Sequence, residues 1–517
     1  MRVEFKVHPD VLLDPERLLD AAVSRARVRR KHVVGFTMLR RSIDARKGRV
    51  RVLVVAELRI RGEAPAEPTR GLIGLPALTG VPRVAIVGAG PAGMFCAWAL
   101  AKRGIRSVVL ERGKPIRARR LDLAALMRRG ALDPESNYCF GEGGAGTFSD
   151  GKLYTRANKR GAVMDVLDAF IAYGASADIR VDARPHIGTN KLPGVVTRMR
   201  EHLESAGVTF RFGVAVRGLR TRDRAVVGVD LDDGEVLDVD AVVLAVGHSA
   251  RDVHRFTAEA GAAVEAKSFA VGVRVEHPQS FIDRAQFGDL AGHPALGAAA
   301  YRLVERVGDR GVFSFCMCPG GFIAPAATEA GGQVVNGWSP SSRGGDFANS
   351  GFVVEVDADV LASHGLDPSD PFAGVAFQRD LEARAYGAGG GDYVAPASRI
   401  ADFVAGGVSS DLPACSYRRG VRPVDLAPVL AGLADPLRQA LRQVDARIPG
   451  FAGPQGVAVA VESRTSCPVR TVRDPKSLAS PTLAGLYPCG EGAGFAGGIM
   501  SAALDGIRIA DAITRPA

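Results

Sequence analysis

The chain has 517 residues, which is too long for one hydrophobic core and predicts two to three domains. Its composition, 47% hydrophobic and 24% charged, is that of an ordinary globular protein, and no apolar run is long enough to span a bilayer. The seven cysteines include no C-x-x-C pair, so neither disulfides nor a metal site is expected. The N-terminus lacks the apolar core of a secretory signal, so we expect a cytoplasmic protein that does not bind membranes.

The positive charge is concentrated at the start of the chain. Residues 1–61 contain 16 Lys and Arg against 7 Asp and Glu, although the whole chain has a net charge of only +10. Such a surface can bind nucleic acid, but no aromatic residues are interleaved for base stacking, so a solvated basic face is the favoured interpretation. The apolar pattern predicts a small α+β (ferredoxin-like) domain, with strands over 3–7, 33–39 and 50–60 and a helix over 15–28.

Residues 62–82 are rich in Pro and Gly and are predicted to be a linker. After the linker, the apolar run 84–87 leads directly into a G-x-G-x-x-G motif. In such a motif Gly88 allows a tight turn, Gly90 allows the backbone to approach a pyrophosphate, and Gly93 allows the helix to lie close to the strand. This order of strand, motif and helix predicts a dinucleotide-binding Rossmann unit.

Two further features support that unit. Pro91 and Ala92 open the helix predicted over 91–103, whose free N–H groups would face the anion. A second apolar run, 107–110, ends at Glu111 and Arg112, and a carboxylate at this point can accept hydrogen bonds from the adenosine ribose. Later segments continue the fold, with a helix over 192–206, a strand over 208–212, hairpins over 214–239 and a buried strand over 241–247.

The C-terminal segment resembles the second flavin-binding motif of FAD oxidoreductases with the glutathione-reductase-type fold. A short strand leads to Gly490 and Glu491, where that superfamily more commonly has Gly-Asp, and the resemblance implies that the acid holds the ribityl chain. Gly497, Gly498 and Ile499 then begin a helix, predicted to end near Ala512, whose N-terminus would face the flavin. The run Leu244–Ser249 likewise resembles the strand that ends beside FAD in this superfamily, at Gly247.

Four other motifs resemble a family of bacterial FAD-dependent dehydrogenases, the NAD(P)/FAD-dependent oxidoreductases. They lie at 137–153, 269–278, 313–321 and 464–470, and the resemblance covers essentially the whole chain. The first contains a loop with Gly144 and Gly146, which suits contact with a flat ring or a pyrophosphate. The resemblance implies noncovalently bound FAD.

These observations predict an α/β protein with a Rossmann-like FAD-binding domain of glutathione-reductase type. This domain is expected to comprise residues 83–268 and 455–517. An inserted mixed α/β substrate domain is expected over 269–454, and the small basic domain at 1–61 precedes the linker.

The sequence offers four candidate catalytic residues, Cys316, Cys318, Arg274 and Arg464. The two cysteines would lie on the same side of a strand, where they are interpreted as small buried residues lining the flavin face, with a redox pair as the less favoured alternative. The two arginines are candidates for anchoring an anionic substrate, and a structural hydrogen-bonding role is an equal alternative.

The predicted function is hydride transfer between a small organic substrate and FAD. Because the chain has only one complete G-x-G-x-x-G unit, the other electron exchange is expected to involve oxygen, a transiently bound NAD(P)H or a protein partner. Two alternatives remain open. One is a single-component flavin monooxygenase, and the other is an FAD-bearing, RNA-modifying protein whose residues 1–61 bind nucleic acid.

Overall fold

The computed structural model describes residues 1–46, 49–62, 74–81, 83–155 and 161–515. Most of the predicted linker, 63–73 and residue 82, lies outside the described residues. Among the helices that are described, none combines the length and the apolar character needed to cross a lipid bilayer.

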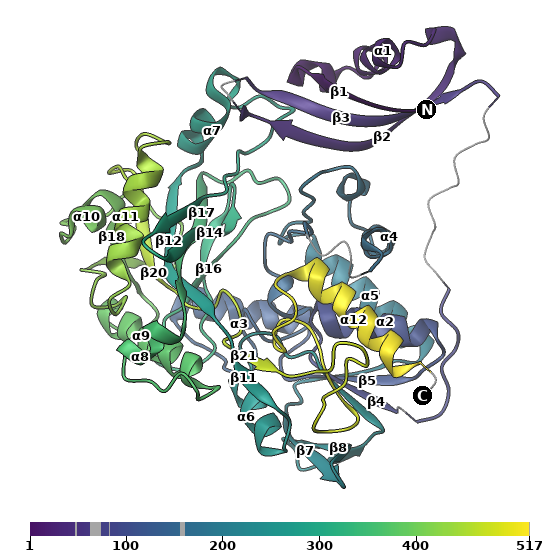
Figure 1. Cartoon of the computed structure of the whole chain (residues 1–517), viewed down its shortest axis with the longest axis vertical. Coiled ribbons are helices and arrows are strands. Elements are labelled where there is room, and N and C mark those ends of the chain that lie inside the picture. Colours follow the sequence, from purple (N-terminus) through teal and green to yellow (C-terminus); the bar gives the residue numbers. More distant parts are fainter. Residues whose placement is uncertain (47–48, 63–73, 82, 156–160, 516–517) are drawn as a thin grey trace.

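The N-terminal unit is a three-stranded antiparallel sheet with one α-helix on it, seen at the top of Figure 1. Asp14 caps the helix by accepting hydrogen bonds from the N–H groups of Glu16 and Arg17 at 3.0 and 3.2 Å. These elements form a small α+β unit and correspond to the first four of the β-α-β-β-α-β ferredoxin-like pattern, but this sheet has three strands, so the ferredoxin-like topology stays a prediction. In chain order they are β1 (Arg2–Val7), α1 (Pro15–Ala26), β2 (Val33–Asp44) and β3 (Arg51–Ile60), with sheet order β1-β3-β2.

The second body is built on a five-stranded sheet in which all neighbouring strands are parallel. The residues of its three central strands are buried, as expected for a parallel sheet covered on both faces. The α/β fold and the parallel sheet predicted for this part are therefore confirmed. The strand order is β22 (Leu486–Pro488), β10 (Ala241–Leu244), β4 (Val84–Val87), β5 (Ser107–Glu111) and β6 (Thr209–Phe212).

Different elements cover the two faces of this sheet. Ile86 and Val109 point into a core made with a layer of helices, in which α12 lies alongside α2 (Figure 1). Val87 and Val108 point into a second core, formed with an antiparallel meander that confirms the hairpins predicted over 214–239. The helices are α2 (Pro91–Lys102), α4 (Val163–Ala172), α5 (Leu192–Ala206) and α12 (Ile499–Ile513). The meander is β7 (Val216–Arg222), β8 (Ala225–Leu231) and β9 (Val236–Asp238), with α6 (Arg251–Glu259) beside it.

The third body, at the left of Figure 1, is a seven-stranded sheet that is antiparallel except for its last pair. β20 belongs to this sheet although it lies beyond residue 454, where the substrate domain was expected to end. The order is β13 (Val304–Val307), β14 (Arg310–Cys318), β17 (Phe347–Val356), β12 (Phe269–Pro278), β20 (Val457–Glu462), β18 (Ala395–Arg399) and β19 (Val421–Pro423). Its helices are α7 (Gln279–Phe287), α8 (Ala358–Ser363), α9 (Ala373–Gly389), α10 (Ile400–Ala405) and α11 (Ala434–Asp445).

Smaller elements complete the chain. There are also two antiparallel ribbons of two strands each. The first pairs β11 (Val264–Ala266) with β21 (Val469–Thr471), and the second pairs β15 (Phe322–Pro325) with β16 (Val335–Trp338). Helix α3 (Ile116–Arg129) shares a hydrophobic cluster with the second ribbon.

The N-terminal unit is attached to the rest of the described structure through the edge of β2. Arg41 donates its backbone N–H to Val181 at 2.8 Å and accepts one from Ala183 at 2.9 Å. Its guanidinium also pairs with Asp182 at 2.5 Å. In addition, the apolar core of this unit is continuous with that of the seven-stranded sheet. The described residues of the N-terminal unit are therefore an integral part of the fold.

Candidate functional site

A cavity of about 390 Å³ lies at the carboxyl ends of β4, β5 and β10, where open α/β sheets commonly bind ligands. Both α2 and α12 begin at its wall. Two of the predicted cofactor residues, Gly93 and Gly490, lie outside the lining. The lining includes the others: Gly88, Gly90, Pro91, Ala92, Glu111, Arg112, Gly144, Gly146, Gly247, Glu491, Gly497, Gly498 and Ile499.

The first glycine turn has the geometry that its sequence predicted. Gly88 has a positive φ of 105°, and a Cβ there would lie 2.5 Å from the carbonyl oxygen of Ala245. A Cβ at Gly93 would lie 2.0 Å from the carbonyl oxygen of Gly88, so Gly93 lets α2 approach β4 closely. These two glycines shape the turn and its packing.

Other glycines leave space in the cavity. The nearest atom to a Cβ placed on Gly90 would be the Cα of Gly144 at 3.9 Å, and nothing lies within 4 Å of one placed on Gly247, Gly497 or Gly498. Side chains at these positions would project into open space. The cavity is therefore a cradle bounded by backbone and by two helix N-termini, which suits the pyrophosphate and ring system of a dinucleotide.

Glu111 organises the loops at one end of the cavity. Its buried carboxylate accepts three backbone hydrogen bonds, from Ala89 at 2.8 Å, Gly113 at 2.9 Å and Gly141 at 2.8 Å. The contact with a ribose that the sequence predicts would therefore have to use the remaining acceptor capacity of a carboxylate that already accepts three backbone hydrogen bonds. The neighbouring Arg112 is held by Glu135 and Asp252.

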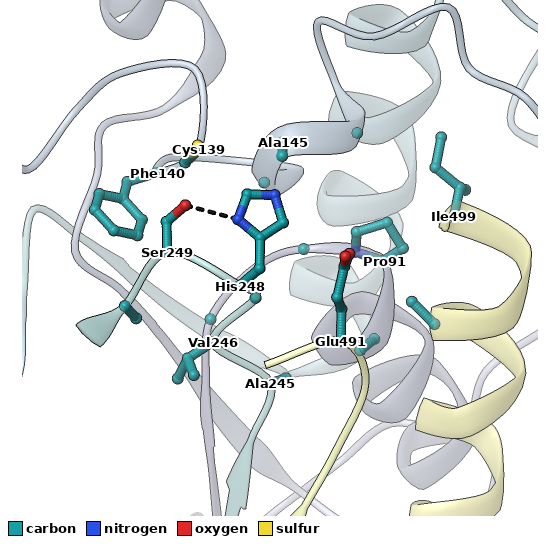
Figure 2. A pocket seen from close by; sticks show the side chains of 18 of the residues that line it. Pro91, Cys139, Phe140, Ala145, Ala245, Val246, His248, Ser249, Glu491 and Ile499 are labelled. Carbon is teal, nitrogen blue, oxygen red and sulfur yellow. Dashed lines mark hydrogen bonds between the residues drawn. The ribbon is translucent and has the colours of Figure 1, made fainter. Parts of the chain in front are cut away.

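Two titratable side chains point into the middle of the cavity (Figure 2). Burial raises the pKa of Glu491 to about 7, against the opposing effect of Lys267. Burial, together with the nearby charges of Arg464 and Arg251, lowers the pKa of His248 to about 4. At neutral pH, His248 is therefore an uncharged imidazole, and its Nδ1 lies 2.7 Å from the Ser249 hydroxyl.

Gly490 supports the site from behind the lining. Its N–H donates to Asp505 Oδ2 at 2.8 Å, and the Asp505 carboxylate is held by two hydrogen bonds from Arg473 at 2.8 and 2.9 Å. Asp505 is on α12, so this network fixes the strand end at β22 relative to the start of α12. Gly490 would therefore affect a bound cofactor only indirectly, by fixing the position of the strand end relative to α12.

The end of the cavity that the seven-stranded sheet lines contains Lys152, Tyr154, Phe315 and Cys316. The Lys152 ammonium lies 2.9 Å from an Asp150 carboxylate oxygen, 3.9 Å from the sulfur of Cys316 and 3.7 Å from that of Cys318. Both cysteines were predicted from the sequence as candidate site residues, whereas Lys152 was not. The feature of the sequence that could have indicated Lys152 is its position at the end of the glycine-rich loop.

Cys318 and Arg274 lie behind this wall. Both are buried and neither lines the cavity. The Arg274 guanidinium bonds to Glu462 Oε2 at 2.9 Å, to Asn349 Oδ1 at 2.8 Å and to the Cys316 carbonyl oxygen at 2.7 Å. Arg274 is thus satisfied by the protein itself, which favours the structural alternative over substrate binding.

Arg464 is also fully engaged within the protein. Its guanidinium makes two hydrogen bonds to Glu382, at 3.0 and 2.9 Å, and a further one to Thr328. Arg251 binds the same carboxylate at 3.1 and 2.9 Å. This buried arginine–glutamate–arginine cluster does not line the cavity, so Arg464 also fits the structural alternative.

Comparison with known protein families gives four matches along the chain. A family described as FAD-dependent protein, C-terminal domain-like, matches residues 268–465. A domain family of unknown function matches 2–59. The pyridine nucleotide-disulphide oxidoreductase family matches 164–276, and an NAD(P)-binding Rossmann-like domain matches 86–119.

Individual relatives were also found. An uncharacterized protein of Clostridium beijerinckii is 41% identical over 437 residues, which is 83% of this chain and 80% of that protein. Among solved structures, glycine oxidase from Geobacillus kaustophilus covers 84% of this chain and 95% of its own, at 14% identity and a TM-score of 0.37. CtdE in complex with FAD covers 83% of each chain, at 13% identity and a TM-score of 0.31.

The extent of the match to the Clostridium protein shows shared family membership, and the matched domains identify the cofactor and the reaction class. The chain belongs to a family of FAD-dependent proteins and is an FAD-dependent oxidoreductase.

Proposed function

We propose that the protein is an FAD-dependent dehydrogenase that transfers hydride between a small organic substrate and noncovalently bound FAD. The observation that carries this proposal is the single cavity that links the glycine turn before α2 with the glycine turn before α12. FAD supplies a two-electron acceptor at its ring, and the chain supplies binding, orientation and electrostatics.

The lining residues can be assigned to successive parts of the FAD molecule. Gly88, Gly90 and Gly144 would hold the pyrophosphate, and Glu111 would contact the adenosine ribose. The start of α12 at Ile499 would direct the positive end of a helix dipole toward the ring. This assignment follows the sequence motifs and the order of the residues around the cavity.

The uncharged His248 and the half-titrated Glu491 are suited to handling protons near the ring. With a pKa of about 7, the Glu491 carboxyl exchanges its proton near neutrality, as a general acid or base requires. His248 would present a neutral imidazole that can donate or accept a hydrogen bond, depending on its tautomer. Neither role requires an additional charged group.

The test is an anaerobic screen of the purified yellow protein against organic substrates and nicotinamides. A dehydrogenase substrate should bleach the visible flavin absorbance directly, without oxygen. Rapid NADPH oxidation coupled to hydroxylation of a substrate, with no direct bleaching by that substrate, would instead select the flavin monooxygenase.

A separate assay addresses the nucleic-acid alternative. RNA binding should weaken with salt if it uses the basic residues of the N-terminal unit. Because Arg41 and the apolar core join this unit to the rest of the fold, charge-reversal of exposed arginines is a better test than deletion of residues 1–61.

A further inference from the structure

Two cysteines and a lysine form a compact group at the edge of the flavin cavity. Lys152 Nζ lies within 3.9 Å of the Cys316 sulfur and 3.7 Å of the Cys318 sulfur. Cys316 lines the cavity, whereas Cys318 is fully buried behind it. We call these three residues the thiol site. Its two sulfurs share one cation, and only one of them faces the cofactor space.

A β-bulge creates this arrangement. Between Phe315 and Cys318, β14 advances three residues while its partner β17 advances two, from Gly351 to Asn349. The extra residue puts Cys316 in the left-handed region, with a φ of 45°, which is uncommon for a residue other than glycine. In a regular strand, alternate Cα atoms lie about 6.6 Å apart, near the upper limit for a disulfide, and a bulge shortens this spacing.

Cations surround the thiol site and can stabilise a thiolate there. Lys152 and Arg343 both bind Asp150, at 2.9 and 2.8 Å, and the buried Arg274 binds Glu462 and lies 3.4 Å from the Cys318 sulfur. Lys152 and Arg343 are only partly buried, with 35% and 18% of their side chains exposed. Lys152 is therefore placed to act as the counter-ion of an ionised thiol.

We propose that Cys316 and Cys318 form a dithiol–disulfide couple that exchanges an electron pair with the flavin, with Cys316 as the sulfur that faces the cofactor and Lys152 as its counter-ion. The inference rests on the proposed FAD-dependent function and adds a second redox centre to it. It gives the flavin a route for electrons that needs no second nucleotide-binding domain.

The reaction balances within the protein. The Cys316 thiolate and the Cys318 thiol form one S–S bond and together lose two electrons and one proton. Oxidised flavin would accept both electrons and that proton, so no further oxidant or base is needed. In the reverse direction, reduced flavin would return the electron pair and the proton, which cleaves the disulfide and restores the thiolate and the thiol.

The surrounding groups favour this division of roles between the sulfurs. A hydrogen bond from Cys318, followed by the charges of Lys152 and Arg274, holds the pKa of Cys316 well below its usual value despite burial and the opposing charge of Asp150. Burial and the negative charge at Cys316 raise the pKa of Cys318, although Lys152 and Arg274 oppose this effect. Burial raises the pKa of Glu462 to about 7, to which Cys316 also contributes, although the larger effect of Arg274 opposes the rise.

The decisive experiment counts electrons. Oxidised holoenzyme is titrated anaerobically with dithionite until the flavin and any disulfide are reduced. Wild-type protein should consume about twice as much reductant per flavin as Cys318→Ser, because the variant retains only the flavin as a two-electron acceptor. Cys415→Ser, which changes a partly exposed cysteine outside the thiol site, should behave as wild type. Equal consumption by wild type and Cys318→Ser would overturn the proposal.

Two further measurements do not depend on FAD loading. In wild-type protein treated with diamide, the peptide that carries both cysteines should resist alkylation and weigh two hydrogens less, and should return to the dithiol form after reduction. Complete alkylation of both thiols after oxidation would overturn the proposal, even if Cys318→Ser does not fold. A colourless protein that still forms this disulfide would instead contradict the proposed flavin function alone.

The role of Lys152 has its own control. In the apoprotein, Lys152→Met should slow iodoacetamide alkylation of Cys316 by about tenfold or more at neutral pH, because the thiolate loses its counter-ion. Lys191→Met, which changes an exposed lysine, should leave the rate unchanged. An unchanged rate in Lys152→Met would show that Lys152 does not stabilise a Cys316 thiolate.

Discussion

The backbones of Gly90 and Gly144 meet across one end of the cavity, although the two residues belong to different loops. A Cβ on Gly144 would lie 3.1 Å from the Cα of Gly90, while a Cβ on Gly90 would point into open space with no atom closer than 3.9 Å. Gly90 also has a φ of −76°, which any residue can adopt. Neither the backbone conformation nor the packing of the fold therefore requires a glycine at position 90, and its hydrogen leaves space in the cavity.

This relationship predicts that Gly90→Val folds but loses FAD. The isopropyl group would occupy the space assigned to the pyrophosphate, so the purified variant should be colourless. Its far-UV circular dichroism and unfolding midpoint should remain close to those of wild type. Gly407→Val is a matched control, since Gly407 is exposed with its nearest neighbour also at 3.9 Å, and this variant should be yellow. A yellow Gly90→Val protein with full FAD occupancy would refute the placement.

Glu111→Gln should weaken both the fold and cofactor binding. A glutamine can offer one oxygen to the N–H groups of Ala89, Gly113 and Gly141, but its NH2 group would face at least one of them. We expect a loss of about 1–3 kcal/mol in the free energy of unfolding of the apoprotein, measured by urea denaturation. Glu57→Gln, at an exposed position, should change it little, and equal stability of both variants would argue against the role given to Glu111.

The Glu382 cluster predicts a stability loss at acid pH. Arg464 and Arg251 outweigh burial and lower the pKa of Glu382 from 4.5 to about 2. A depressed native pKa stabilises the folded state above the unfolded pKa, so this contribution should disappear as the pH falls from about 4.5 to about 2. Glu382→Gln should be less stable than wild type by about 3–5 kcal/mol at neutral pH, because two buried arginines lose their counter-charge. The difference should shrink at about pH 3.

Urea unfolding of wild type, Glu382→Gln and the exposed control Glu259→Gln at both pH values checks this prediction. The control should follow wild type. A stability difference for Glu382→Gln that is independent of pH would contradict the assigned ion pairs.

The raised pKa of Glu491 predicts that stability depends on pH in the opposite direction. Its native pKa is raised from 4.5 to about 7 by burial, so its contribution to apoprotein stability is fully present below about 4.5 and is lost as the pH rises through 7. Glu491→Gln removes this titration, and the variant should therefore gain stability relative to wild type between about pH 5 and about pH 8. Thermal unfolding of the two apoproteins at both pH values measures the effect, and parallel pH curves would exclude it.

The local motifs around the cavity could be recognised in the sequence because each depends on short-range geometry. The turn before α2 requires glycine at positions 88 and 93, and the helix that begins at Ile499 directly follows two glycines. The parallel pairing of β4 with β5 follows from the strand–helix–strand order in which α2 connects them. Most predicted lining residues could therefore be named without coordinates.

Long-range pairings could not be read in this way. Lys152 meets Cys316 and Cys318 only because a loop of one sheet domain reaches a bulge in the other. Arg464 follows β20 and Glu382 lies on α9, and their ion pair likewise connects segments that are far apart in the sequence. Nothing in the spacing of these two residues along the chain indicates that they pair. From the sequence, a structural role was favoured for Cys316 and Cys318 and was an equal alternative for Arg464, and Lys152 and Glu382 were not identified. Choosing between these roles requires the tertiary partners.

An FAD titration of the apoprotein, followed by visible absorbance and flavin fluorescence, tests whether the cavity binds FAD. We expect saturable uptake of one FAD per chain by wild type and by Gly407→Val, and none by Gly90→Val. Failure of correctly folded wild-type protein to take up FAD, or equal uptake by Gly90→Val, would show that FAD does not bind as proposed.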